Sequence, residues 1–247
     1  MAGNTFYRLG RITSVQFRKA KWLWQSVAGS EADAIQAEHG VGRDMAMVVL
    51  EEMPRDSDQT TQALLDEVEV KLTRVVRNRL HRFQMTAVGP NRPTAFALPG
   101  GFIFVARSLV DLCERDRDEV AFVLAHEMAH VIRRHAIDRL LQQKVVSALA
   151  LASPGRGALA SWIRQVGVQG LARAYSQDQE FEADELGLRL MRAAGFDPAG
   201  AIRLLERLGR LEGTPGPLGL DPYFSTHPPV DDRVSRLRLL AAEPRLK

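Results

Sequence analysis

The sequence lacks the cysteines that form the disulfide cross-links of small secreted domains. It has 247 residues and one cysteine, Cys113, so no disulfide can form within the chain. Hydrophobic residues make up 45% of the sequence, which is enough to build a core without cross-links. Because apolar residues precede Cys113, we expect its thiol to be buried and unreactive.

Long apolar runs are also missing. A membrane-spanning helix needs about 20 predominantly apolar residues, whereas the best candidate, residues 145–155, is short and ends in Pro154-Gly155. The first residues contain no apolar signal segment. These absences predict a cytoplasmic protein. The basic and aromatic segment 18–24 leaves peripheral membrane contact open, against the alternative of a core-packed helix with a basic outer face.

No block of like charge is present. The net charge is +3, and acidic residues are interleaved with basic ones along the whole chain. This pattern argues against a nucleic-acid partner. The sequence does not indicate an oligomeric state.

Hydrophobic periodicity predicts a mostly α (α+β) fold with one small β-sheet. Strand-like segments gather between residues 83 and 105, where two short strands flank Gly100-Gly101. Helical spacing occupies most of the rest, in residues 30–53, 59–78, 116–135, 137–152, 157–174, 176–195 and 230–242.

We expect a single domain over residues 1–247. It would begin with a basic helix at 1–29, followed by a core at 30–242. That core would include a helical hairpin at 137–174 and a Gly- and Pro-rich loop at 213–229.

The segment His126–His130 reads His-Glu-Met-Ala-His. Two histidines four residues apart lie on one face of a helix, about 6 Å apart along its axis, so both imidazoles can reach one tetrahedral zinc ion. Glu127 is rotated by about 100° from His126. It can therefore act as general base on a zinc-bound water without binding the metal. His135 would lie about 140° from His130 on the same helix, and we do not expect it to be a ligand.

The third metal ligand is expected among the acidic side chains of residues 175–184. Glu182 shares its helix face with charged residues and is expected to face water. Glu180 and Asp184 share a face with small and apolar residues, which suits close packing on another helix. Buried carboxylates need a metal or a partner. We therefore expect Glu180 to bind zinc and Asp184 to accept from a ligand imidazole, with a salt bridge to a buried arginine as the alternative for Asp184.

These residues resemble the zinc metallopeptidase family of the HtpX heat-shock proteases, the Oma-type proteases and the CAAX prenyl proteases. The motif at His126–His130 and the Glu180-x-x-x-Asp184 spacing support the resemblance, as do the segments 95–101, 194–198 and 225–228. The resemblance implies a zincin-like fold with one zinc ion per chain. One departure is Gln177, at a position where the family often has arginine.

The resemblance also implies a substrate site. An extended peptide would add to a strand edge ahead of the motif helix, by main-chain hydrogen bonds. In this sequence that segment contains Ala95, Phe96, Ala97, Gly100 and Gly101.

His227, in the late Thr-His-Pro element, has three open roles. It could donate to the oxyanion, bind zinc as a fourth ligand and hold the enzyme latent, or be a bystander in the loop.

The sequence thus predicts a zinc-dependent endopeptidase that acts on protein substrates. The resemblance implies a role in protein quality control. The alternative is a zinc-stabilised, chaperone-like or membrane-surface binding protein with a closed, inactive site.

Overall fold

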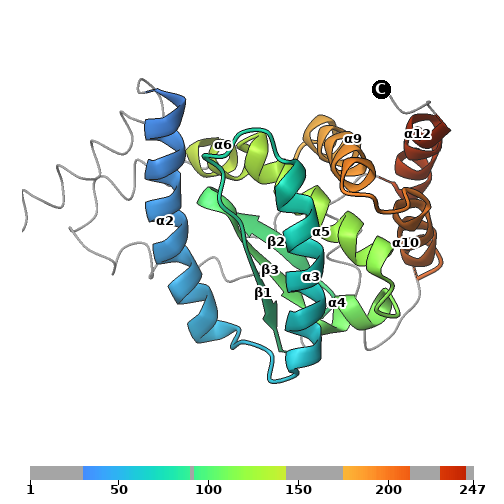
Figure 1. Ribbon diagram of the computed structural model, residues 1–247, viewed down its shortest axis with the longest axis horizontal. Coiled ribbons are helices and arrows are strands. Elements are labelled where there is room, and N and C mark those ends of the chain that lie inside the picture. The colour runs from blue at the N-terminus through green and yellow to red at the C-terminus, as the bar shows by residue number, and fades with distance from the viewer. Residues whose placement is uncertain (1–29, 90–91, 143–174, 212–228, 243–247) are drawn as a thin grey trace, which may run out of the picture.

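The computed structural model describes residues 30–89, 92–142, 175–211 and 229–242. It is mostly helical with one small sheet, which confirms the predicted fold class (Figure 1). The segment 1–29, nearly all of the expected hairpin and nearly all of the expected loop lie outside the described residues.

The described helices follow the predicted pattern closely at most positions. Their bounds are α2 Glu31–Glu52, α3 Gln59–Val75, α4 Arg107–Leu112, α5 Arg117–Ile132, α6 His135–Gln142, α9 Gln177–Ala193, α10 Ala199–Gly209 and α12 Val230–Ala242. Within the described ranges, no helix combines the length and the apolar character that a membrane span requires.

The sheet has three strands: β1 Gln84–Val88, β2 Ala95–Leu98 and β3 Phe102–Ala106. Strand β3 lies in the centre, parallel to β1 and antiparallel to β2. Among the described strands, β2 therefore has a neighbour on one side only, which makes it an edge strand.

The bend between β2 and β3 depends on Gly100 and Gly101. Their φ angles are 75° and 93°, in the left-handed region that favours glycine. A Cβ on Gly100 would also lie 2.3 Å from the Cα of His39 in α2. The two glycines thus let the bend turn tightly and let α2 pack directly against it.

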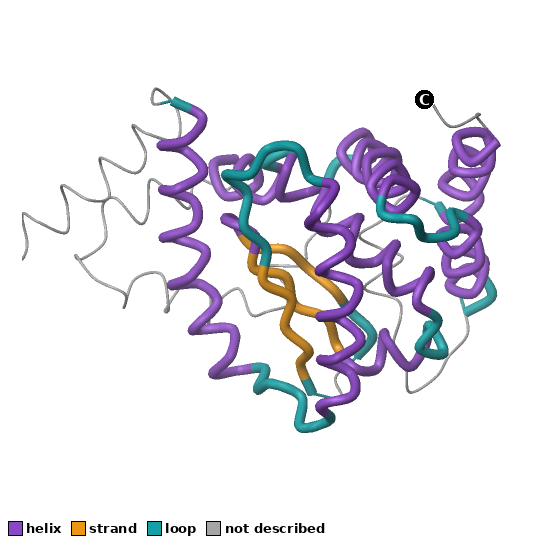
Figure 2. Tube along the Cα trace, in the orientation of Figure 1, coloured by secondary structure: helices purple, strands orange, loops and turns teal. Residues whose placement is uncertain are grey.

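The strands lie between helices in the backbone trace of Figure 2, and their alternating side chains are buried on both faces of the sheet. One face contributes to a core shared with α3 and α5, through Met85, Ala87, Ala97, Ile103 and Val105. The other face packs with residues of α2, through Phe96, Leu98, Phe102, Phe104 and Ala106. The sheet is therefore the middle layer between α2 and the helices that bear the predicted site.

The N-terminus of α5 is fixed by capping and ion pairing. Asp116 accepts hydrogen bonds from the backbone N–H groups of Asp118 and Glu119, at 2.9 and 3.0 Å. Arg203 of α10 donates to the same carboxylate at 3.1 and 3.2 Å. These contacts set where the motif helix begins. Cys113, just before it, is fully buried, and burial raises the pKa of its thiol, as expected for an unreactive cysteine.

The end of α5 differs from the prediction. The expected helix ran to His135, but α5 ends at Ile132, and Arg134 adopts a left-handed φ of 62°. Arg134 donates to the buried carboxylate of Glu38 in α2, with Nε 2.7 Å from Oε1. The chain therefore turns before His135, which starts α6. The short helix α4 was not predicted.

Candidate functional site

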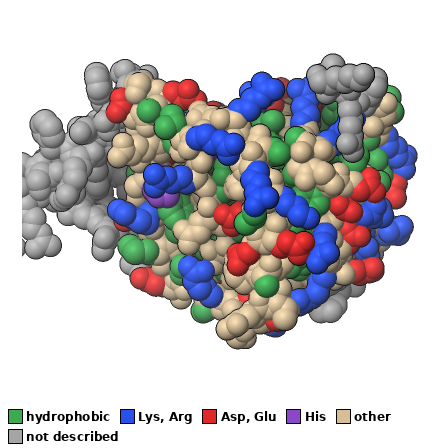
Figure 3. Space-filling view, viewed as in Figure 1, with side chains coloured by type: hydrophobic (Ala, Val, Ile, Leu, Met, Phe, Trp, Pro, Cys, Tyr) green, Lys and Arg blue, Asp and Glu red, His purple; other side chains and the backbone are tan. Residues whose placement is uncertain are grey.

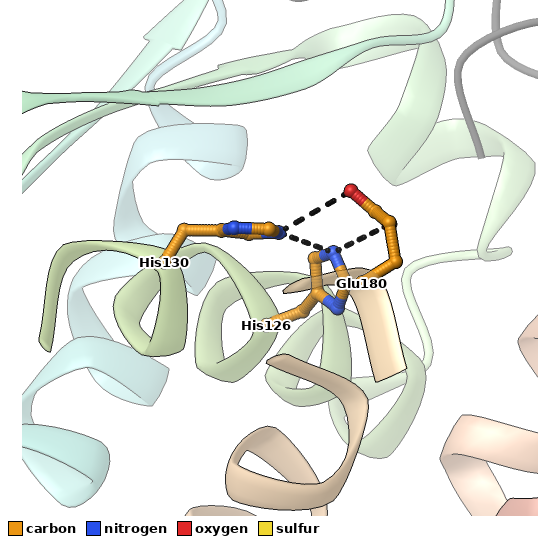
Figure 4. A group of neighbouring side chains, drawn as sticks. All are labelled: His126, His130 and Glu180. Atoms are coloured by element: carbon orange, nitrogen blue, oxygen red, sulfur yellow. Dashed lines mark hydrogen bonds and ion pairs between the residues drawn. The ribbon is translucent and has the colours of Figure 1, made fainter. Parts of the chain in front are cut away.

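Two helices bring three potential metal ligands together. His126 and His130 lie one turn apart on α5, and Glu180 lies in the first turn of α9. One ligand atom from each lies within 4.8 Å of the others, and all three side chains are buried. Figure 4 shows both imidazoles and the carboxylate pointing toward one another. This is the grouping expected from the motif and from the face of α9.

The distances fit a small metal ion. Nε2 of His126 lies 3.1 Å from Nε2 of His130, and the Glu180 oxygens lie 3.6 and 3.5 Å from these two nitrogens. A tetrahedral ion with bonds of about 2.0–2.1 Å places its ligand atoms roughly 3.3 Å apart. Two imidazoles and one carboxylate also match the donor set of catalytic zinc sites that keep a fourth position for water.

The electrostatics of the site favour a cation. Burial lowers the pKa of His126, but the carboxylates of Asp184 and Glu180 outweigh burial and raise it to about 10. Positive charge at this place is therefore stabilised, whether a proton or a metal ion supplies it.

Asp184 makes both of the contacts considered for it. Its Oδ1 lies 3.0 Å from Nδ1 of His126. Arg233 of α12 donates to its two oxygens from Nε and a terminal nitrogen, at 2.8 and 2.7 Å. Although burial raises the pKa of Asp184, the guanidinium of Arg233 holds it below its usual value. The arginine keeps the carboxylate charged, so it can orient His126.

Arg233 was not among the residues predicted for the site, although its position in the sequence offered a signal. It lies on the apolar face of α12 with Val230, Val234 and Leu237, and it is 2% exposed. An arginine inside an apolar stripe requires a buried anion as its partner. That position within the stripe was the available signal.

His135 is outside the group of three converging ligand atoms, as expected, but it lies closer to His130 than the helical spacing indicated. Its Nδ1 lies 2.9 Å from Nδ1 of His130, because α5 ends before it and the chain turns back. Its Nε2 lies 3.4 Å from Glu182, which is exposed as expected. Burial lowers the pKa of His135 despite that carboxylate. Tyr175 stacks on His130, with ring centroids 3.9 Å apart.

Close packing of α9 on α5 depends on Gly187. A Cβ at this position would lie 3.1 Å from the backbone nitrogen of His126 and 3.2 Å from its Cα. The small residue thus lets α9 approach the ligand-bearing turn and places Glu180 and Asp184 beside the histidines.

Replacing Gly187 by valine should push α9 away from α5. Overpacking of this kind costs about 1–3 kcal/mol, and we expect metal affinity to fall with it. Gly40→Val in α2 is the matched control, because a Cβ there meets nothing within 4 Å. Urea unfolding and zinc titration of both variants make the comparison. Equal behaviour of the two variants would contradict the packing role of Gly187.

The predicted substrate segment lies next to the motif helix. Strand β2, with Ala95, Phe96 and Ala97, packs against α5 as well as pairing with β3. Gly100 and Gly101 shape the bend that follows, and their close approach to neighbouring backbone gives them a structural role. His227 lies outside the described residues.

The molecular surface carries side chains of both charges. On the face seen in Figure 3, Lys and Arg side chains are interspersed with Asp and Glu. Ion pairs such as Arg117–Glu67 and Arg203–Asp116 join helices across this part of the molecule. No block of one sign is visible on that face.

Comparison with known proteins supports the resemblance noted in the sequence. The sequence profile of peptidase family M48 matches residues 58–241. Mitochondrial metalloendopeptidase OMA1 of Schizosaccharomyces pombe is 32% identical over 67% of this chain and 49% of its own length. OMA1 of Saccharomyces cerevisiae is 35% identical over 59% and 42%. The β-barrel assembly-enhancing protease of Escherichia coli is 28% identical over 63% and 34%.

The chain spans about half or less of the length of these relatives. The expected cytoplasmic location is wrong by this comparison, because the OMA1 relatives are named mitochondrial proteins. That expectation rested on missing apolar segments, which do not specify a compartment.

The motif, the order of the acidic residues and the length of the profile match lead to one conclusion: this chain belongs to peptidase family M48, a family of metallopeptidases.

Proposed function

We propose that this chain is a zinc-dependent endopeptidase that hydrolyses peptide bonds of protein substrates. The observation that supports this most directly is the convergence of His126, His130 and Glu180 at distances suited to one small ion, with Glu127 beside His126 on the same helix. The names of the relatives, metalloendopeptidase and protease, agree with the proposal.

In this proposal His126, His130 and Glu180 hold one zinc ion per chain. Zinc bound there would lower the pKa of a water molecule and polarise the scissile carbonyl. Glu127, which is 7% exposed, would accept the proton from that water. It would then return the proton to the leaving amine. Asp184 would orient His126 through its Nδ1 and so fix which nitrogen faces the metal.

Substrate would bind along the edge of β2 that has no neighbour among the described strands. An extended peptide can add to an edge strand by main-chain hydrogen bonds, which read little of its side-chain sequence. Ala95, Phe96 and Ala97 would supply those groups, and the bend at Gly100 and Gly101 would limit the length of the site. Such recognition suits diverse unfolded segments, as a role in protein quality control requires.

Metal removal tests the proposal. Dialysis against a chelator should abolish casein cleavage, and adding back one equivalent of zinc should restore it. Metal analysis should give one zinc per chain before removal. His39→Ala is a suitable control, because His39 bonds to Gly100 rather than to the ligand group and should leave zinc content unchanged. Continued cleavage by protein that contains no detectable metal would refute the proposal.

A further inference from the structure

The two histidines of the ligand group are supported in different ways. His126 contacts a carboxylate, Asp184, which is itself paired with Arg233. His130 contacts another imidazole, that of His135. His130 and His135 are 1% and 3% exposed, so their contact lies in the protein interior.

The geometry dictates how protons must be distributed along this contact. A neutral imidazole has one N–H and one bare nitrogen. If Nε2 of His130 faces a metal, together with His126 and Glu180, then its hydrogen must be on Nδ1. That N–H points at Nδ1 of His135, which lies 2.9 Å away and must therefore be the bare acceptor.

The same reasoning fixes which nitrogen of His135 carries its hydrogen. With Nδ1 bare, its hydrogen is on Nε2, which lies 3.4 Å from Oε2 of Glu182. Glu182 is held in turn by Arg133, whose Nε lies 2.9 Å from Oε1. Every hydrogen thus points outward along one path, from His130 to His135 to Glu182.

Two further contacts hold the path in place. Tyr175 stacks on the face of His130 with an angle of 18° between the rings, which restricts rotation of the imidazole. The left-handed residue Arg134, paired with Glu38 of α2, forms the turn that brings His135 back over α5.

We propose that His135 is a positioning residue for the metal centre: it accepts the Nδ1 hydrogen of His130 and so fixes the tautomer and ring orientation of that ligand, while Glu182 fixes His135. The proposal rests on the proposed zinc site. Outer partners of ligand histidines typically contribute about 10- to 100-fold to metal affinity, and we expect His135 to contribute in that range.

Zinc affinity of the folded chain, measured by competition with a chromogenic chelator, tests this role. His135→Leu removes the acceptor and should weaken binding about 10- to 100-fold. His135→Asn keeps an oxygen at the position of Nδ1 and should restore most of the affinity. His81→Leu is the control, because the described contacts of His81 lie away from the ligand group, and it should bind as the unaltered chain does. Unchanged affinity in a folded His135→Leu protein would overturn the proposal.

A second measurement uses the unaltered sequence and does not depend on a variant that folds. Long-range nitrogen–proton NMR of the zinc-loaded protein should show the hydrogen of His130 on Nδ1 and that of His135 on Nε2. A hydrogen on Nδ1 of His135 would overturn the inference. If the unaltered chain bound no zinc at all, the proposed function would fail; if it bound zinc and cleaved casein while His135→Leu bound equally well, only this inference would fail.

Discussion

Replacing Glu127 by glutamine is expected to abolish peptide-bond cleavage while zinc stays bound. Glutamine has nearly the same shape but cannot accept a proton, and general-base catalysis contributes about 100- to 10,000-fold to rates. Glu127 is outside the group of three converging ligand atoms, so metal content should not change. Hydrolysis of a quenched fluorescent casein and metal analysis of the same sample measure both quantities.

The comparison needs a second glutamate that is changed in the same way. Glu185 of α9 pairs with Arg189 at the surface, so Glu185→Gln should retain full activity and full zinc content. Cleavage by Glu127→Gln at the rate of Glu185→Gln would remove Glu127 from the mechanism. Loss of zinc from Glu127→Gln would instead assign it a ligand role.

Arg233→Met is expected to give the largest loss of stability among single changes near the site. Removing one partner of a buried ion pair costs about 3–5 kcal/mol, because the other charge stays buried without its partner. Arg233 and Asp184 are 2% and 3% exposed. The free energy of unfolding in urea measures the loss, and a zinc titration should show weaker binding, since Asp184 also orients His126.

Helix α12 offers a matched control. Arg238 pairs with Glu206 at the surface, and exposed pairs contribute about 0.2–1 kcal/mol. Arg238→Met should therefore have little effect. The double change Asp184→Asn with Arg233→Met should be less harmful than the sum of the single changes, because neither charge is then left alone. Equal stability of Arg233→Met and Arg238→Met would show that the buried pair is not needed for folding.

The helices were predictable because their apolar spacing and caps are local properties of the sequence. Ser176, for example, caps α9 with Gln179 in a reciprocal pair of hydrogen bonds, and the helix begins where the sequence indicates. The face argument that singled out Glu180 and Asp184 worked for the same reason. Both residues are buried against α5, and Glu182 is exposed.

The partners that complete the cluster were not predictable from local patterns. Arg233 reaches Asp184 across 49 residues, a contact set by helix packing. His135 was assigned to the same helix as His130 because no glycine or proline marks the end of α5. The left-handed conformation of Arg134 depends on tertiary contacts, including its bond to Glu38. The parallel pairing of β1 with β3 likewise has no local signature.

The position of Arg233 has a consequence for synthesis of the chain. It follows His130 by roughly one hundred residues, so at about 5–20 residues per second it is made some 5–20 s later. Until then Asp184 lacks its buried counter-charge. Packing of α9 against α5 would therefore have a less favourable free energy than in the complete domain. The charge network around the proposed metal ligands would thus be completed only after α12 has been made, well after the motif helix itself.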